Sequence, residues 1–155
     1  MSNKQDLKDV WPIINEVVSS DGEFSLKPNG VSMLPLIRPG IDAVTIVAPK
    51  DLKKDDIVLY RRASGQFVLH RLIRIKKGRC TMFGDNQKII EYKIPVTNVL
   101  AKVKSIYRDG EAIDFDGKEY KKYLKKLHRK INFYKLPTLL YRIKCKLVKR
   151  KSTSK

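Results

Sequence analysis

Short apolar runs separated by turn residues occupy the chain between residues 23 and 115, and this pattern limits the possible folds most strongly. The runs are rich in β-branched residues, and no segment between them has the length or periodicity of a helix. Lys76-Lys77-Gly78 and Asp109-Gly110 are turn sequences of the kind that close hairpins. We predict seven strands, at residues 24–26, 43–47, 57–60, 66–75, 80–83, 99–107 and 112–115. The fold class is therefore mainly β, a mixed β-domain that does not alternate strands with helices.

The run at residues 99–107 shows the clearest alternation. Its small and apolar positions predict that one set of side chains faces the same way: Val99, Ala101, Val103, Ser105 and Tyr107.

Helical patterns precede and follow the β-rich region. Residues 5–19 carry an apolar stripe (Leu7, Val10, Trp11, Ile14, Val17 and Val18), and Pro12 suits this helix best if it begins near Val10 or Trp11. After Gly117 two basic amphipathic helices are expected, the first with Tyr120, Tyr123, Leu124, Leu127 and Ile131 on one face. The second begins near Pro137 and carries Leu139, Leu140, Ile143 and Leu147. We predict an N-terminal helix at 1–22, a catalytic β-domain at 23–117 and a basic helical tail at 118–155.

The positive charge is concentrated in the tail. Residues 120–155 contain 14 Lys and Arg and no acid, whereas residues 1–119 contain 20 basic and 16 acidic residues. Basic amphipathic helices suit a peripheral contact with an anionic membrane, where each cation contributes about 1 kcal/mol and the apolar stripe adds burial. A solvated or partner-packed tail is the alternative. Nucleic acid is the least favoured partner, because a continuous Leu/Ile stripe has no use there.

Several other classes of protein are not expected from these residues. No apolar stretch is long enough for a transmembrane helix, and the charged first residues do not resemble a secretory signal. Cys80 and Cys145 are predicted to be free thiols, and with only two histidines no metal site is expected. No phosphate-binding glycine loop is present, so we predict no cofactor. The expected location is the cytoplasmic side, with peripheral membrane association.

Three short segments contain residue types that nucleophilic catalysis needs. Ser32, His70 and Asp85 each lie in or beside a predicted strand end. A serine hydroxyl becomes a good nucleophile when a base takes its proton, and a carboxylate holds that base in the required tautomer. Composition alone is a weak argument, because most domains of this size contain a turn serine, a core histidine and a turn aspartate.

The residues around these three positions form four boxes in order: Ser32-Met33-Leu34-Pro35, Asp55-Asp56-Ile57-Val58, His70-Arg71-Leu72 and Gly84-Asp85-Asn86. They resemble the boxes of the serine peptidase superfamily that includes signal peptidase I and the self-cleaving SOS repressors. The histidine in the third box resembles the archaeal and endoplasmic-reticulum subtype, whereas the bacterial enzymes carry a lysine. Asp55 stands where the family pattern has glycine.

The resemblance implies a role for each residue. Ser32 would be the nucleophile, His70 the general base and then acid, and Asp85 the orienting carboxylate. Glu91 is the next acid in the sequence after Asp85 and is the alternative for the orienting role. Met33 and Pro35 would shape the substrate groove.

Two neighbouring positions complete the expected site. Gly30 stands where many bacterial signal peptidases have a hydroxyl, so backbone N–H groups, including that of Ser32, would hold the developing oxyanion. Arg71 is expected to pair with a core acid such as Asp42 or Asp56, without a catalytic role.

The predicted function is that of a serine endopeptidase which cleaves an extended peptide or a leader sequence through an acyl-enzyme. By resemblance, the substrate is a peptide or preprotein with small residues before the scissile bond. The absence of an apparent membrane anchor distinguishes the chain from signal peptidases that process preproteins in general. A self-cleaving regulator is one alternative, although the chain has no Ala-Gly dipeptide and no evident helix-turn-helix. A non-catalytic membrane- or nucleic-acid-binding module on a peptidase scaffold is the other.

Overall fold

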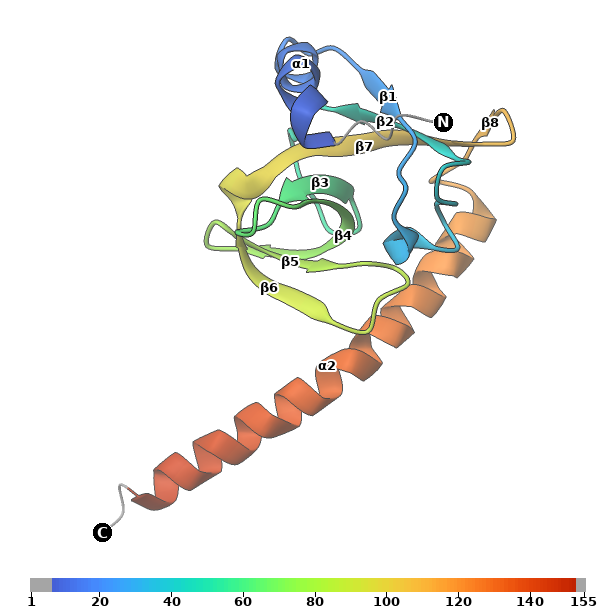
Figure 1. Cartoon of the computed structure of the whole chain (residues 1–155). Coiled ribbons are helices and arrows are strands. Elements are labelled where there is room, and N and C mark those ends of the chain that lie inside the picture. The colour runs from blue at the N-terminus through green and yellow to red at the C-terminus, as the bar shows by residue number, and fades with distance from the viewer. Residues whose placement is uncertain (1–6, 153–155) are drawn as a thin grey trace. The chain divides into compact units, whose positions relative to one another are not determined.

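The computed structural model describes residues 7–152, with side chains described through residue 135. The chain forms two compact units, Met1–Ile113 and Asp114–Lys155. The first unit contains helix α1 and the sheet, and the second contains helix α2 (Figure 1).

An antiparallel eight-stranded sheet forms most of the first unit, which confirms a mainly β fold (Figure 1). The strands are β1 (Phe24–Leu26), β2 (Ala43–Val47), β3 (Ile57–Arg61), β4 (Phe67–Lys76), β5 (Arg79–Phe83), β6 (Ile90–Pro95), β7 (Val99–Arg108) and β8 (Glu111–Ala112). Their order in the sheet is β1-β2-β7-β3-β4-β5-β6, and β8 pairs with β7. Strand β6 was not predicted, and β8 is shorter than the predicted strand at 112–115.

Two hairpin turns follow the sequence prediction. Lys77 and Gly78, between β4 and β5, have φ angles of 50° and 67°. Asp109 and Gly110, between β7 and β8, have φ angles of 53° and 89°. Two successive residues in the left-handed region match the twist of the flanking strands, which is why glycine at the second position favours these hairpins.

One apolar cluster in the sheet is made by Val58, Tyr60, Val68, Leu72, Cys80, Met82 and Val99. Burial of these side chains is the main favourable term for folding of the unit. Cys80 is a free, buried thiol, as predicted. Cys145 lies outside the described side chains.

A β-bulge changes the face that the end of β7 presents. Thr45 of β2 pairs with Ser105, but the next residue, Ile46, pairs with Val103, so Lys104 is an extra residue on β7. The extra residue reverses the alternation beyond it. Ile106 is therefore buried and Tyr107 is 43% exposed. The prediction that Tyr107 shares a face with Val103 is wrong.

Helix α1 (Leu7–Ser19) contributes two buried side chains to the core, Ile14 and Val18. The helix confirms most of the prediction at residues 5–19. It begins at Leu7 and not near Val10 or Trp11, the start that would suit Pro12 best, so the proline lies in its interior. Proline removes one backbone donor from a helix. Burial of the two aliphatic side chains offsets this loss.

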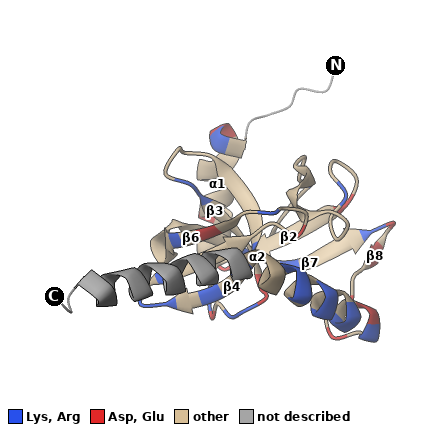
Figure 2. Ribbon diagram, turned by 90° about the horizontal axis from the view of Figure 1, so that it is seen from below, with Lys and Arg blue, Asp and Glu red and all other residues tan. Residues whose placement is uncertain are grey.

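Helix α2 (Lys118–Ser152) is one continuous helix, so the prediction of two basic helices separated before Pro137 is wrong. Proline here removes a donor without ending the helix. The stripe predicted at Leu139, Leu140, Ile143 and Leu147 lies outside the described side chains. Figure 2 marks the basic residues along the described part of α2; the exposed ones are Lys118, Lys121, Lys122, Lys125, Lys126 and Arg129. Within residues 7–152, neither helix contains an apolar stretch sufficient to cross a membrane.

Candidate active site

Ser32 lies in a one-turn 3₁₀ helix, η1 (Val31–Met33), which follows the loop after β1. The N–H of Leu34 donates to the Val31 carbonyl at 3.3 Å, and that of Ile37 donates to the Met33 carbonyl at 3.0 Å. These bonds fix the turn and leave the Ser32 side chain half-buried at the wall of a pocket.

The two residues predicted to bind substrate differ in position. Met33 lines the pocket and is only 2% exposed. Pro35 is exposed and lies outside the pocket lining, and its carbonyl accepts a hydrogen bond from Arg108 at 2.8 Å. Of the two, only Met33 belongs to the lining of the pocket.

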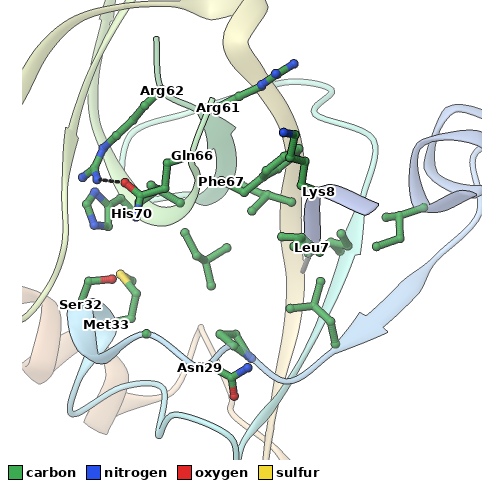
Figure 3. A pocket seen from close by; sticks show the side chains of 18 of the residues that line it. Leu7, Lys8, Asn29, Ser32, Met33, Arg61, Arg62, Gln66, Phe67 and His70 are labelled. Carbon is green, nitrogen blue, oxygen red and sulfur yellow. Dashed lines mark hydrogen bonds between the residues drawn. The ribbon is translucent and has the colours of Figure 1, made fainter. Parts of the chain in front are cut away.

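His70 lies in the middle of β4, opposite Val58 of β3, and is 2% exposed. It lines the same pocket as Ser32, and η1 lies beside β4 (Figure 3). Among the residues described, no hydrogen bond joins the Ser32 hydroxyl to the imidazole. Such bonds are often long without substrate and tighten when it binds. The fold thus brings together the predicted nucleophile and the predicted base.

The Gly84-Asp85-Asn86 box connects these two residues. The N–H of Asn86 donates to the Ser32 carbonyl at 2.7 Å, and its side-chain Nδ2 donates to the Val31 carbonyl at 3.2 Å. On the other side, a Cβ atom at Gly84 would stand 2.8 Å from His70 Nε2. Glycine is therefore the only residue that lets this backbone approach the imidazole so closely.

Asp85 forms an ion pair inside the protein. Arg71 Nε and Nη2 donate to its two carboxylate oxygens at 2.9 and 2.6 Å, and both side chains are fully buried. Arg71 Nη1 also donates to the Asp55 carbonyl at 2.8 Å. Arg71 therefore pairs with Asp85, where the sequence favoured Asp42 or Asp56.

The carboxylate at His70 Nδ1 belongs to Glu91, on β6. Glu91 Oε1 lies 3.2 Å from Nδ1, and the Tyr60 hydroxyl lies 3.1 Å from the same nitrogen. Arg62, the residue after β3, holds Glu91 with two bonds, from Nε at 2.9 Å and from Nη2 at 2.5 Å. A bidentate pair of this kind fixes the orientation of the carboxylate.

Burial and charge set the protonation of the pair. Burial lowers the pKa of His70 to about 4, although the Glu91 carboxylate favours the imidazolium. Burial alone would raise the pKa of Glu91, but hydrogen bonds from Arg62 and Tyr60 outweigh it and bring that pKa below its ordinary value. At neutral pH Glu91 is thus a carboxylate and His70 a neutral imidazole. A proton on Nδ1, where both the Glu91 carboxylate and the Tyr60 hydroxyl can accept it, leaves the lone pair on Nε2, where a general base needs it.

The pocket has a volume of about 1120 Å³ and extends from η1 across the sheet to α1. Figure 3 shows Ser32, Met33 and His70 on one side and Leu7 and Lys8 on the other. A cavity of this volume can hold several residues of a peptide.

Sequence reasoning identified Glu91 only as the alternative acid and did not identify Tyr60 or Arg62. A prediction of β6 would have placed Glu91 at the start of the strand that follows the Gly84-Asp85-Asn86 box. No local signal connects Tyr60 or Arg62 with a histidine on the neighbouring strand. Neither a family model nor a curated protein sequence matches this chain, so a functional assignment depends on the site itself.

Proposed function

We propose that this protein is a serine endopeptidase of the signal-peptidase type, which cleaves an extended peptide or leader sequence through an acyl-enzyme. The observation that carries the proposal is a buried His70 held at Nδ1 by Glu91, in the wall of the pocket that Ser32 also lines. A neutral imidazole with its free nitrogen beside a half-buried serine has the parts that nucleophilic acyl transfer requires.

The reaction proceeds in two halves. Ser32 Oγ attacks the peptide carbonyl while its proton passes to His70 Nε2, which gives a tetrahedral intermediate. His70 then donates this proton to the amine nitrogen as the C–N bond breaks, and the acyl group remains on Ser32. A water molecule attacks the ester, gives a proton to His70, and the proton returns to Ser32 as the carboxylic acid leaves.

Glu91 takes the orienting role in this proposal. Its carboxylate accepts Nδ1–H and stabilises the imidazolium that forms during each half-reaction. Asp85, paired with Arg71, instead stabilises the turn that carries Gly84 and Asn86 against His70 and η1. Glu91 thus takes part in the reaction, whereas Asp85 has a structural role.

The backbone N–H of Ser32 is the proposed donor to the oxyanion. It lies in the first turn of η1, where N–H groups have no acceptor within the helix itself. Gly30, two residues earlier, supplies no hydroxyl. The preferred substrate has small residues before the scissile bond, as the resemblance implies, so that the carbonyl can reach η1 beside Met33.

A peripheral contact of α2 with an anionic membrane forms the second part of the proposal. Six exposed cations, from Lys118 to Arg129, occupy one side of its described first turns, with no acid after Glu119 in residues 120–135. Phe133 is 69% exposed on the same helix. An aromatic ring beside exposed cations suits a lipid headgroup layer, where the ring buries and the cations meet phosphate.

A quenched fluorescent peptide with alanines at the cleavage position tests the peptidase activity. We expect the native protein to cleave it and Ser32→Ala to reduce the rate by at least about 10³-fold. Ser20→Ala, an exposed serine at the end of α1, serves as the matched control. A fluorophosphonate should add one adduct mass to the native protein and none to Ser32→Ala. Equal cleavage by the native protein and Ser32→Ala would contradict the proposal.

A further inference from the structure

The pocket continues well beyond Ser32 and His70, and its far part is apolar. Its floor there is formed by residues of α1, β1, β2, β3 and β4: Ile14, Leu26, Ile46, Leu59, Phe67 and Val68. Leu7 and Lys8 lie across the pocket from Ser32 (Figure 3). Side chains of a bound peptide several residues from the scissile bond would therefore enter apolar surroundings.

The charged residues around this floor all have the same sign. Lys8, Lys27, Arg61 and Arg62 line the pocket, and none of the lining residues is Asp or Glu. This is not a general property of the region, because residues 1–119 contain 16 acids against 20 basic residues. The absence of carboxylates is thus local to the pocket.

Two of these cations are available to a ligand. Arg62 is engaged by Glu91. Lys27 and Arg61 are exposed, and within the described residues neither forms an ion pair with a carboxylate. Arg61 lies 5.9 Å from the ring centroid of Phe67, so its guanidinium is held over the apolar floor. A guanidinium in that place can bind a carboxylate with two donors.

We propose that the groove selects peptides in which an acidic side chain accompanies apolar ones, with the carboxylate bound at Arg61 or at Lys27, the two exposed cations of its lining. The inference names the substrate class of the site and rests on the proposed function for cleavage, although binding can be measured alone. A basic side chain in the same place would meet a cation and no carboxylate of the lining, and would be disfavoured. Selectivity would thus arise from attraction for one class and repulsion for the other.

The test uses peptides that share one alanine-containing cleavage site and an apolar segment. They differ only in Glu, Gln or Lys, placed three to six residues to either side of the cleaved bond. We expect Glu at one of these positions to raise kcat/KM about threefold to tenfold over Gln, and Lys to lower it. The advantage should shrink in 0.5 M NaCl, because salt screens exposed charges.

Variants assign the effect to the groove. Lys27→Gln with Arg61→Gln should abolish the preference, and Lys27→Glu with Arg61→Glu should reverse it in favour of Lys peptides. Lys54→Gln with Arg74→Gln removes the same charge from exposed positions outside the pocket and should leave the preference intact. Equal kcat/KM for the Glu, Gln and Lys peptides would overturn the inference while leaving the peptidase intact.

Binding separates the two proposals. Fluorescence anisotropy of labelled peptides with Ser32→Ala reports affinity without cleavage. Charge-selective binding without cleavage by the native protein would support the groove and overturn the peptidase. Binding without charge preference would overturn the inference, as would failure of every peptide to bind.

Discussion

His70 Nδ1 lies 3.2 Å from Glu91 Oε1, although the two residues belong to strands that are not neighbours in the sheet. β4 and β6 flank β5, so the contact spans a whole strand. Arg62, beyond the end of β3, holds Glu91 from the other side. Three parts of the sheet thus converge on one imidazole.

Glu91→Gln should lower kcat/KM at pH 7 by about 10²-fold or more, because an amide can hold the wrong tautomer of His70. Asp85→Asn should act mainly on stability. The measurement is peptide cleavage at pH 7, corrected for folded protein by circular dichroism. Full activity of a folded Glu91→Gln, together with loss of activity in a folded Asp85→Asn, would return the orienting role to Asp85.

Gly84→Ala should inactivate the site while the protein stays folded. The new Cβ would stand 2.8 Å from His70 Nε2 and 2.6 Å from Gln87 Cγ, so the imidazole must shift from the position it holds in the pocket wall. At Gly30 a Cβ meets only Ser32 Oγ, at 4.0 Å, and the backbone there is extended. Gly30→Ala is therefore the matched control, and kcat/KM should fall at least about tenfold only in Gly84→Ala. Equal activity of the two variants would argue against this position for His70.

Loss of Asp85 should destabilise the β-domain strongly. Asp85→Ala leaves the Arg71 guanidinium buried without its carboxylate, which costs about 3–5 kcal/mol. Arg71→Met combined with Asp85→Leu should recover a large part of that loss, since no buried charge then remains. Urea unfolding measures both. Asp21→Asn, which breaks the exposed pair with Lys50, should change the free energy of unfolding little. A similarly small effect for Asp85→Ala would contradict a structural role for the buried pair.

Stability should fall as the pH decreases from 6.5 to 4. The pKa of His70 is about 4 in the folded protein against an ordinary 6.5, so over this range the unfolded chain binds a proton that the folded protein does not. The contribution is fully present above pH 6.5 and decreases by about 3 kcal/mol on reaching pH 4. Urea unfolding at pH 7, 5.5 and 4 measures it.

His70→Gln should show a shallower pH dependence than the native protein. Both proteins should carry His128→Gln, which removes the other histidine. An unchanged slope after replacement of His70 would show that the pH dependence comes from other groups.

Membrane association should depend on the exposed cations of α2. Replacing Lys121, Lys122, Lys125 and Lys126 by Gln removes about 4 kcal/mol of attraction to an anionic surface, at about 1 kcal/mol each. Cosedimentation with vesicles that contain phosphatidylserine should fall accordingly, and native binding should weaken with added salt. Neutral vesicles and a Lys53, Lys54, Lys76 and Lys77 quadruple Gln variant serve as controls. Undiminished binding of the α2 variant would contradict the membrane proposal.

Local patterns accounted for much of the sheet. β-Branched runs and the Lys77-Gly78 and Asp109-Gly110 turns act over a few residues, and the strands formed where these signals lie. Prediction failed where a distant partner decides the outcome. The bulge at Lys104 exists because β2 pairs with β7 in a shifted register, and β6 has weak propensity of its own, with Lys93 at a φ angle of 64°.

The sequence by itself determined the strand segments, the acid-free basic tail and the three short boxes that contain Ser32, His70 and Asp85. Only the tertiary structure decided which carboxylate meets which cation: Asp85 joins Arg71, and Glu91 joins His70. Such choices depend on the register of several strands and on burial, because an ion pair or hydrogen bond requires atoms within a few ångströms. The residue types determine which ion pairs and hydrogen bonds are chemically possible, and the packing of the sheet determines which of them form.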